Sequence, residues 1–125
     1  MTNAAFFLYD GDCAFCTRCA EFIVRRVRPG AAVEPWQRFD IAAAGLSAAD
    51  CQRAVQWVDP PAPVRSGPAA IAAVLRDSRG RLGFWRAVGR VADLPPVRAA
   101  AGPVYRLVAR NRHRMPGGTA SCALR

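Results

Sequence analysis

The sequence lacks lysine, has a single histidine and contains no long apolar run. Its 18 basic residues are all arginine and face only nine acids, so the formal net charge is +9. No apolar run approaches the roughly 18 residues that span a bilayer. The N-terminus also has neither the basic segment nor the long apolar segment of a secretory signal peptide. We therefore expect a cytoplasmic protein of one domain.

Cysteines are present, but the expected compartment does not favour disulfides. A chain of 125 residues is long enough to bury a core without covalent staples. In a reducing compartment the cysteines should be thiols, and a C-x-x-C pair there indicates redox catalysis or metal binding. The five cysteines are Cys13, Cys16, Cys19, Cys51 and Cys122.

Acidic residues are scarce in the second half of the chain. Residues 1–60 hold six arginines and seven acids, whereas residues 61–125 hold twelve arginines and two acids. Arg106, Arg110 and Arg114 recur at a spacing of four on a predicted C-terminal helix. Such a face is typical of a docked helix with a solvated basic surface, and contact with an anionic lipid, a nucleic acid or an acidic partner is the alternative. Because no nucleic-acid-binding motif accompanies it, we expect no nucleic acid partner and at most a weak anionic surface contact.

Apolar periodicity and turn residues predict the order strand, helix, strand, helix, strand, strand, helix, followed by two more helices. Pro35 inside the second strand predicts that this strand lies at a sheet edge. Ser47 with Asp50 three residues later resembles a capping box, and Pro68 suits the first turn of a helix. The predicted strands are 5–9, 33–41, 55–59 and 64–66, and the predicted helices are 13–28, 47–54, 68–76, 82–94 and 104–115.

This order is that of an α/β thioredoxin-like domain, with a four-stranded mixed sheet, flanking helices and a C-terminal helical extension. The core should occupy residues 5–77, the extension residues 78–116 and a flexible tail residues 117–125. Most thioredoxin-like proteins have a cis-proline before the third strand, but the residues before Val55, LSAADCQRA, contain no proline. The usual way of docking a substrate is therefore in doubt.

Three short motifs resemble those of the DCC family of thiol-disulfide oxidoreductases. The first, Y-D-G-x-C-x-x-C, is similar to Tyr9, Asp10, Gly11, Asp12, Cys13 and Cys16. The second, G-x-x-A, is similar to Gly67 and Ala70, and the third, Y-x-x-x-A-x-N-R, is similar to Tyr105, Ala109, Asn111 and Arg112. The resemblance covers about residues 5–122 and implies a thioredoxin-like fold and dithiol chemistry, without a substrate.

Cys13 and Cys16 are the predicted catalytic pair. Cys13 should lie exposed in the first helical turn, where unpaired N–H groups and the helix dipole favour the thiolate. Cys16 should lie on the apolar stripe and resolve a mixed disulfide. The carboxylates of Asp10 and Asp12 oppose the Cys13 thiolate about as strongly as the helix favours it, which predicts a mild reductant. Asp12 should also cap the helix, and Asp10 beside Gly11 suits a turn.

The other three cysteines are predicted to be auxiliary or structural. Cys19 should point into the core, with an auxiliary redox or metal role as the alternative. Cys51 should be a core residue. Cys122, in a tail rich in glycine and serine, is either unused or a second resolving thiol.

The spacing of the first three cysteines does not match common metal sites. An iron–sulfur run needs a further cysteine where the chain has Ile23, and haem attachment needs histidine where it has Thr17. Zinc prefers four ligands, and His113 is remote and surrounded by arginines. We therefore expect no metal and no cofactor.

The predicted function is reduction of disulfides in proteins or small molecules, with an external thiol donor that restores the dithiol. Two alternatives stay open. One is a basic adaptor module with a vestigial C-x-x-C pair. The other is a soft-metal site for Cu(I) or zinc at Cys13, Cys16 and Cys19.

Overall fold

The computed structural model describes residues 5–80 and 83–111. The strands are β1 (Phe6–Tyr9), β2 (Ala32–Pro35), β3 (Gln56–Val58) and β4 (Arg65–Ser66). The α-helices are α1 (Ala14–Phe22), α2 (Ala48–Arg53), α3 (Pro68–Arg76), α4 (Phe84–Ala92) and α5 (Pro95–Asn111). A π-helical turn, η1 (Ile23–Val27), extends α1, and two short 3-10 turns, η2 (Trp36–Arg38) and η3 (Ala42–Ala44), follow β2.

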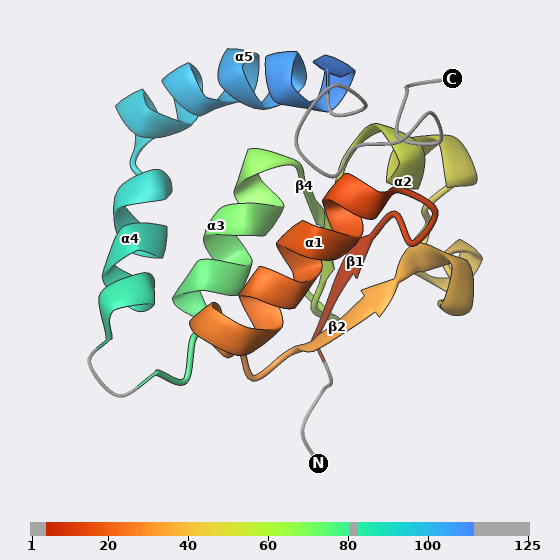
Figure 1. Ribbon diagram of the computed structural model, residues 1–125, viewed down its shortest axis with the longest axis horizontal. Helices are drawn as coiled ribbons and strands as arrows, with labels where there is room; N and C mark the ends of the chain where they lie inside the picture. The colour runs from red at the N-terminus through yellow and green to blue at the C-terminus, as the bar shows by residue number, and fades with distance from the viewer. Residues whose placement is uncertain (1–4, 81–82, 112–125) are drawn as a thin grey trace.

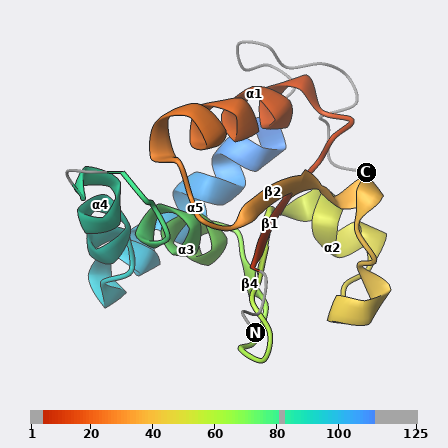
Figure 2. The ribbon, with the colours of Figure 1, turned by 90° about the horizontal axis from the view of Figure 1, so that it is seen from below.

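The four strands form one mixed sheet in the order β2-β1-β3-β4. β1 runs parallel to β2 and antiparallel to β3, and β3 runs antiparallel to β4. α1 and α3 lie on one side of this sheet and α2 on the other, while α4 lies outside α3 (Figures 1 and 2). This arrangement confirms the predicted α/β thioredoxin-like fold, including the edge position of the strand that contains Pro35.

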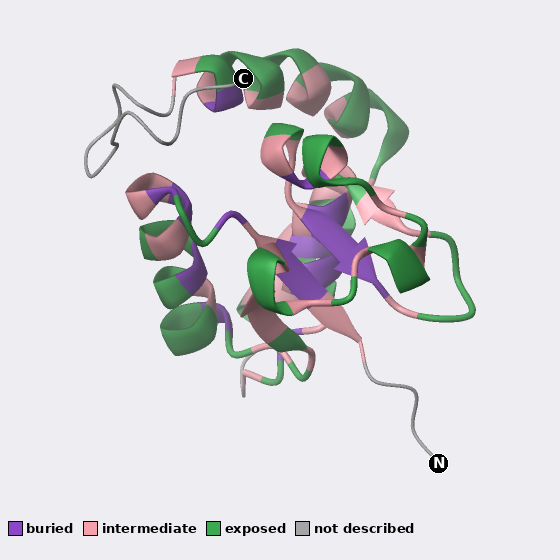
Figure 3. Ribbon diagram, turned by 90° about the vertical axis from the view of Figure 1, so that its right-hand side faces the viewer, coloured by how far each residue is buried: buried purple, intermediate pink, exposed green. Residues whose placement is uncertain are grey.

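The core lies between the sheet and α3. Phe7 of β1 pairs with Trp57 of β3, and both pack against Ala70, Ala73 and Val74 on one face of α3. Figure 3 shows the buried residues concentrated in the strands, with exposed residues on the outer helices. The small alanine side chains of α3 leave room for two large aromatic side chains of the sheet. Phe7 and Trp57 therefore fill the space between the sheet and α3.

Two predicted elements differ from the structure. The second strand ends at Pro35, and residues 36–38 form a 3-10 turn, because Pro35 cannot donate a ladder hydrogen bond. The helix expected to begin at residue 104 is the second half of α5, which runs through Pro103. Gly102 has no Cβ to clash with the ring of the following proline, so the helix continues. Residues 112–115 of that predicted helix and the predicted tail 117–125 lie outside the described residues.

α5 is joined to the sheet through Tyr105. The backbone N–H of Val55 donates to the Tyr105 hydroxyl at 3.0 Å, just before β3 begins. The Tyr105 ring also covers Gly67, where an added Cβ would lie 3.5 Å from the ring.

Among the described helices, none has both the length and the apolar character of a membrane span.

Gly67 requires a backbone conformation that other residues avoid. Its φ of 60° and ψ of −129° allow the chain to enter α3 directly from β4. We expect Gly67→Ala to lower the free energy of unfolding by about 2–3 kcal/mol. Gly45→Ala is the matched control, because Gly45 also has a positive φ, of 76°, but has open space around it; it should cost about 1 kcal/mol. Urea denaturation measures both values, and equal losses would contradict the argument.

Asp93 holds α4 against two other elements. Its carboxylate accepts hydrogen bonds at 2.6 Å from Arg65 of β4 and from Arg76 of α3. Burial acts to raise the pKa of Asp93, but the hydrogen bonds and charges of Arg65 and Arg76 outweigh it and hold the pKa below its usual value. The ionised carboxylate is therefore the form that the fold stabilises.

This lowered pKa predicts an acid dependence of stability. The contribution of Asp93 should be complete above the unfolded-state value of about 3.9 and be lost as the pH falls through the folded-state pKa. Asp93→Asn should therefore destabilise the protein at neutral pH and make little difference in strong acid. Unfolding by urea across a pH series measures this, and Arg76→Gln should reproduce part of the effect. A constant difference between Asp93→Asn and wild type at every pH would contradict it.

Candidate thiol site

A tight turn carries the chain from β1 into α1. The N–H of Cys13 donates to the carbonyl of Asp10 at 3.2 Å, which closes a four-residue turn over Gly11 and Asp12. The N–H of Asp12 donates to Oδ1 of Asp10 at 3.0 Å, so the side chain reinforces the turn. The predicted turn residues thus form one unit immediately before the helix.

The turn is fastened to the end of β2 by Gln37. Its Nε2 donates to Oδ1 of Asp10 at 2.9 Å, and its Oε1 accepts from the N–H of Gly11 at 3.0 Å. A Cβ at Gly11 would lie only 2.8 Å from the Cβ of Pro35, so only glycine fits this approach. Asp10 is 4% exposed, and these hydrogen bonds satisfy a buried carboxylate.

Gln37 is a site residue that the sequence analysis missed. The prediction of a strand over residues 33–41 placed it within a sheet, where it would have had no role at the turn. The available signal was Pro35, which ends the strand early, next to the carboxyl end of β1. A polar side chain just beyond that point can reach the turn.

Cys13 caps α1, a role that was predicted for Asp12. Its Sγ accepts the N–H of Cys16 at 3.4 Å, and its carbonyl accepts the N–H of Thr17 at 2.9 Å. The sulfur thus lies at the unpaired N–H groups of the first helical turn, where a thiolate is stabilised. Asp12 lies one residue before the cap, because the turn that the Cys13 N–H closes on Asp10 delays the start of α1 to Ala14.

The predicted exposure of the cysteines on α1 was wrong at two positions. Cys13 was expected to be exposed and is 0% exposed, whereas Cys19 was expected in the core and is exposed. Cys16 is 8% exposed, as predicted for a shielded thiol. Cys13 lies seven residues before Ala20, so both share the buried face of the helix, and Cys19 falls at its margin.

Cys13 is disulfide-bonded in the structure, whereas Cys16, Cys19 and Cys51 retain their thiols. The partner sulfur is therefore not one of the other described cysteines. A disulfide between Cys13 and Cys16 stays a prediction. Cys122 lies outside the described residues.

Cys51 and Cys19 are poorly suited to react as nucleophiles. Burial, with the nearby carboxylates of Asp50 and Asp10, raises the pKa of Cys51 to about 11. Surrounding protein atoms also raise the pKa of Cys19 above its usual value, although the residue is exposed. Both should stay protonated at neutral pH, which disfavours them as nucleophiles.

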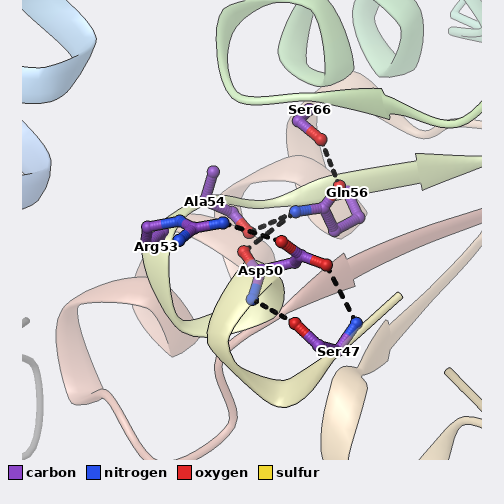
Figure 4. Close-up of polar contacts among 6 residues, drawn as sticks. All are labelled: Ser47, Asp50, Arg53, Ala54, Gln56 and Ser66. Carbon is purple, nitrogen blue, oxygen red and sulfur yellow. Dashed lines mark hydrogen bonds and ion pairs between the residues drawn. The ribbon is translucent and has the colours of Figure 1, made fainter. Parts of the chain in front are cut away.

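A polar network around the buried side chain of Gln56 joins α2 to β3 and β4 (Figure 4). Ser47 and Asp50 form the predicted capping box of α2, and hydrogen bonds from the backbone and side chain of Ser47 hold the pKa of Asp50 below its usual value. Gln56, 1% exposed, donates to the carbonyls of Asp50 and Ala54 at 3.0 and 3.1 Å and accepts from Ser66. The network fixes α2 to β3 and β4, and α2 carries Cys51.

Tyr9, the remaining predicted supporting residue, ends β1 beside the thiol pair. It packs against the buried cluster of Cys13 and Cys16. Burial raises the pKa of its hydroxyl, Arg38 opposes this effect, and Glu34 and Glu21 add to it. The phenol therefore stays neutral and acts through packing.

The sulfurs of α1 do not gather into a metal site. Within residues 5–80 and 83–111, no group of three or more histidine, cysteine or acidic side chains is placed to hold a metal ion. Cys19 is exposed, whereas Cys13 and Cys16 are buried.

A mixed sheet with a C-x-x-C motif at the start of the first helix defines a protein of the thioredoxin-like fold class. The family model for DCC1-like thiol-disulfide oxidoreductases matches residues 7–118. The chain belongs to this family, as the sequence motifs predicted. Searches of curated proteins and of solved structures found no match.

The link between Gln37 and Asp10 can be tested by a nearly isosteric change. Gln37→Glu should replace an attractive hydrogen bond with a carboxylate pair and lower the free energy of unfolding by about 1–3 kcal/mol at neutral pH. As the pH falls, one proton can be shared between the two carboxyls and the repulsion disappears, so the loss should shrink in acid. Gln37→Ala, measured by the same urea titrations, should show a loss without this recovery. Identical pH profiles for the two variants would show that Gln37 does not act through Asp10.

Proposed function

We propose that the protein is a thiol-disulfide oxidoreductase in which Cys13 attacks a substrate disulfide and Cys16 resolves the product. The observation that carries the proposal is the position of Cys13 Sγ at the N-terminus of α1, where it accepts the Cys16 N–H at 3.4 Å. Membership of the DCC1-like family supports the same chemistry.

The proposed reaction consists of two successive thiol–disulfide exchanges. The Cys13 thiolate attacks one sulfur of the substrate disulfide, forms a mixed disulfide and releases the other substrate sulfur as a thiolate, which takes a proton from water. The Cys16 thiol loses its proton and attacks Cys13 Sγ, and the second substrate sulfur leaves. The substrate gains two electrons and two protons, and the Cys13–Cys16 pair becomes a disulfide. An external dithiol or glutathione then reduces this disulfide.

The helix start supports the first step, and the short distance between the two residues supports the second. A thiolate at Cys13 is stabilised by the N–H groups of the first turn. Both sulfurs are buried, so the order of attack rests on the position of Cys13 at the helix start, and Cys16 lies one helical turn further along, within reach of Cys13 Sγ. The carboxylates of Asp10 and Asp12 limit the stabilisation of the thiolate, which favours a mild reductant over a strong oxidant.

The substrate is proposed to be a protein or low-molecular-weight disulfide, and Cys122 is the alternative resolving thiol. A soft-metal site at Cys13, Cys16 and Cys19 is less well supported, because Cys19 faces solvent while the other two are buried. A basic adaptor role would assign no function to the Cys13–Cys16 pair.

Trapping of mixed disulfides tests the assignment of the two cysteines. After prior reduction of the protein, Cys13→Ser should abolish disulfide reduction, because the attacking sulfur is gone. Cys16→Ser should accumulate mixed disulfides with substrate that dithiothreitol releases. Cys19→Ser is the matched control on the same helix and should retain most of the activity. Non-reducing electrophoresis and mass spectrometry identify the linked peptides.

The same experiment separates the two candidate resolving thiols. If Cys122→Ser accumulates mixed disulfides and Cys16→Ser does not, Cys122 is the resolving residue. If Cys13→Ser keeps its reductase activity, the proposed function is wrong.

A further inference from the structure

α4 carries more apolar surface than it buries. One face, which includes Gly89, packs closely against α3, where a Cβ at Gly89 would lie 2.7 Å from the backbone nitrogen of Arg76. A second face carries Phe84, Ala87 and Val91, which recur at spacings of three and four and thus share one side of the helix, and Leu94 follows directly after the helix ends. We call these four residues the α4 stripe. Phe84, Val91 and Leu94 are 62%, 55% and 50% exposed, so the stripe faces solvent.

The aromatic end of α4 is continuous with the end of α1. The ring of Trp85 contacts Phe84 with a centroid distance of 5.0 Å and contacts Phe22 of α1 at 5.6 Å. Phe22 is itself 48% exposed. The apolar surface therefore extends beyond α4 and is larger than one exposed side chain would explain.

An arginine-lined depression adjoins the α4 stripe. It has a volume of about 280 Å³ and is lined by Trp57, Arg65, Ala73, Arg76, Asp77 and Arg90. Arg90 lies three residues after Ala87 and four before Leu94, so it borders both the depression and the stripe. The other two arginines are held in place by Asp93 at 2.6 Å.

The charge around the depression is positive. Two carboxylates, Asp77 and Asp93, face four guanidinium groups. Asp93 interacts with Arg65, Arg76 and, at 3.9 Å, Arg98, and Asp77 lies 3.8 Å from Arg79. Arg90 adds a further positive charge, so arginines outnumber carboxylates beside the α4 stripe. An excess of positive charge next to exposed apolar side chains is the combination that binds the interface of an anionic bilayer.

We propose that the α4 stripe and the adjoining depression form a binding surface for a bilayer that contains anionic phospholipid. The apolar side chains enter the boundary between headgroups and acyl chains. Arg90, with Arg65 and Arg76, receives a phosphate headgroup in the depression. The surface is peripheral, because α4 lies along the outside of the protein (Figure 1).

A second copy of the chain fits this surface less well. Two copies would each bring a net charge of +9, and contact through the stripe would place their arginine-lined depressions close together. An anionic bilayer instead offers opposite charge together with an apolar interior. Each arginine near the bilayer surface should increase the partition of the protein onto the vesicles by about fivefold.

Co-sedimentation with vesicles tests the proposal. The full chain should bind vesicles of phosphatidylcholine containing phosphatidylglycerol and should not bind pure phosphatidylcholine. Val91→Ser with Leu94→Ser should reduce partition by at least tenfold, and Arg90→Gln should reduce it about fivefold. Val24→Ser is the apolar control, since Val24 is 53% exposed on η1, and Arg53→Gln is the charge control on α2. Both controls should bind like the wild type.

Tryptophan fluorescence gives a second readout that depends on the site. Trp85 should shift to shorter wavelength on vesicle binding, and Trp85→Phe should lose that shift. Absence of binding to anionic vesicles, equal binding to neutral ones or equal loss in the control variants would overturn the proposal. So would self-association of the wild type that Leu94→Ser abolishes, because the stripe would then be a contact between copies. Disulfide reductase activity, measured in parallel, should be unchanged in every variant.

Discussion

The buried carboxylate of Asp10 is the constraint on which the rest of the thiol site depends. A charged group that is 4% exposed must be surrounded by donors, and the turn supplies them from the Asp12 N–H and the Gln37 amide. Meeting that requirement brings β1, the end of β2 and the start of α1 to one point. Cys13 then enters the helix as its cap, with the sulfur at the N–H groups of the first turn. The chemistry of the cysteine thus rests on hydrogen bonds made three residues earlier.

The C-terminal helices belong to this arrangement. Tyr105 accepts the N–H of Val55 at the start of β3, the strand that pairs with β1, and its ring covers the glycine that begins α3. A thioredoxin-like core usually has a cis-proline just before this strand, and here Ala54 precedes Val55. The Val55 N–H is already satisfied within the protein by the Tyr105 hydroxyl. α5 therefore helps to hold the start of β3 and the entry into α3.

Much of the fold could be predicted from the sequence because its signals are local. Pro68 and the alanines of α3, the Ser47–Asp50 box and the apolar run of β1 each determine a nearby backbone conformation. The site was less predictable, because it depends on contacts between distant segments. The burial of Cys13 follows from its seven-residue spacing to Ala20, but the predicted cap at Asp12 drew attention away from that spacing. Gln37 is 27 residues from Asp10 in the chain, and no local pattern relates the two.

The positions of the two proposed surfaces have a mechanical consequence. α1 begins at the turn after β1 and ends beside α4, where Phe22 contacts Trp85, so the helix runs from the thiol site towards the α4 stripe (Figure 1). A bilayer on the outside of α4 would face the carboxyl end of α1, and Cys13 at the other end would point away from the lipid. A disulfide substrate would then reach the dithiol from the aqueous side. Because no residue of the stripe lies in the turn from Asp10 to Cys13, the proposed lipid binding and thiol exchange would use separate parts of the molecule.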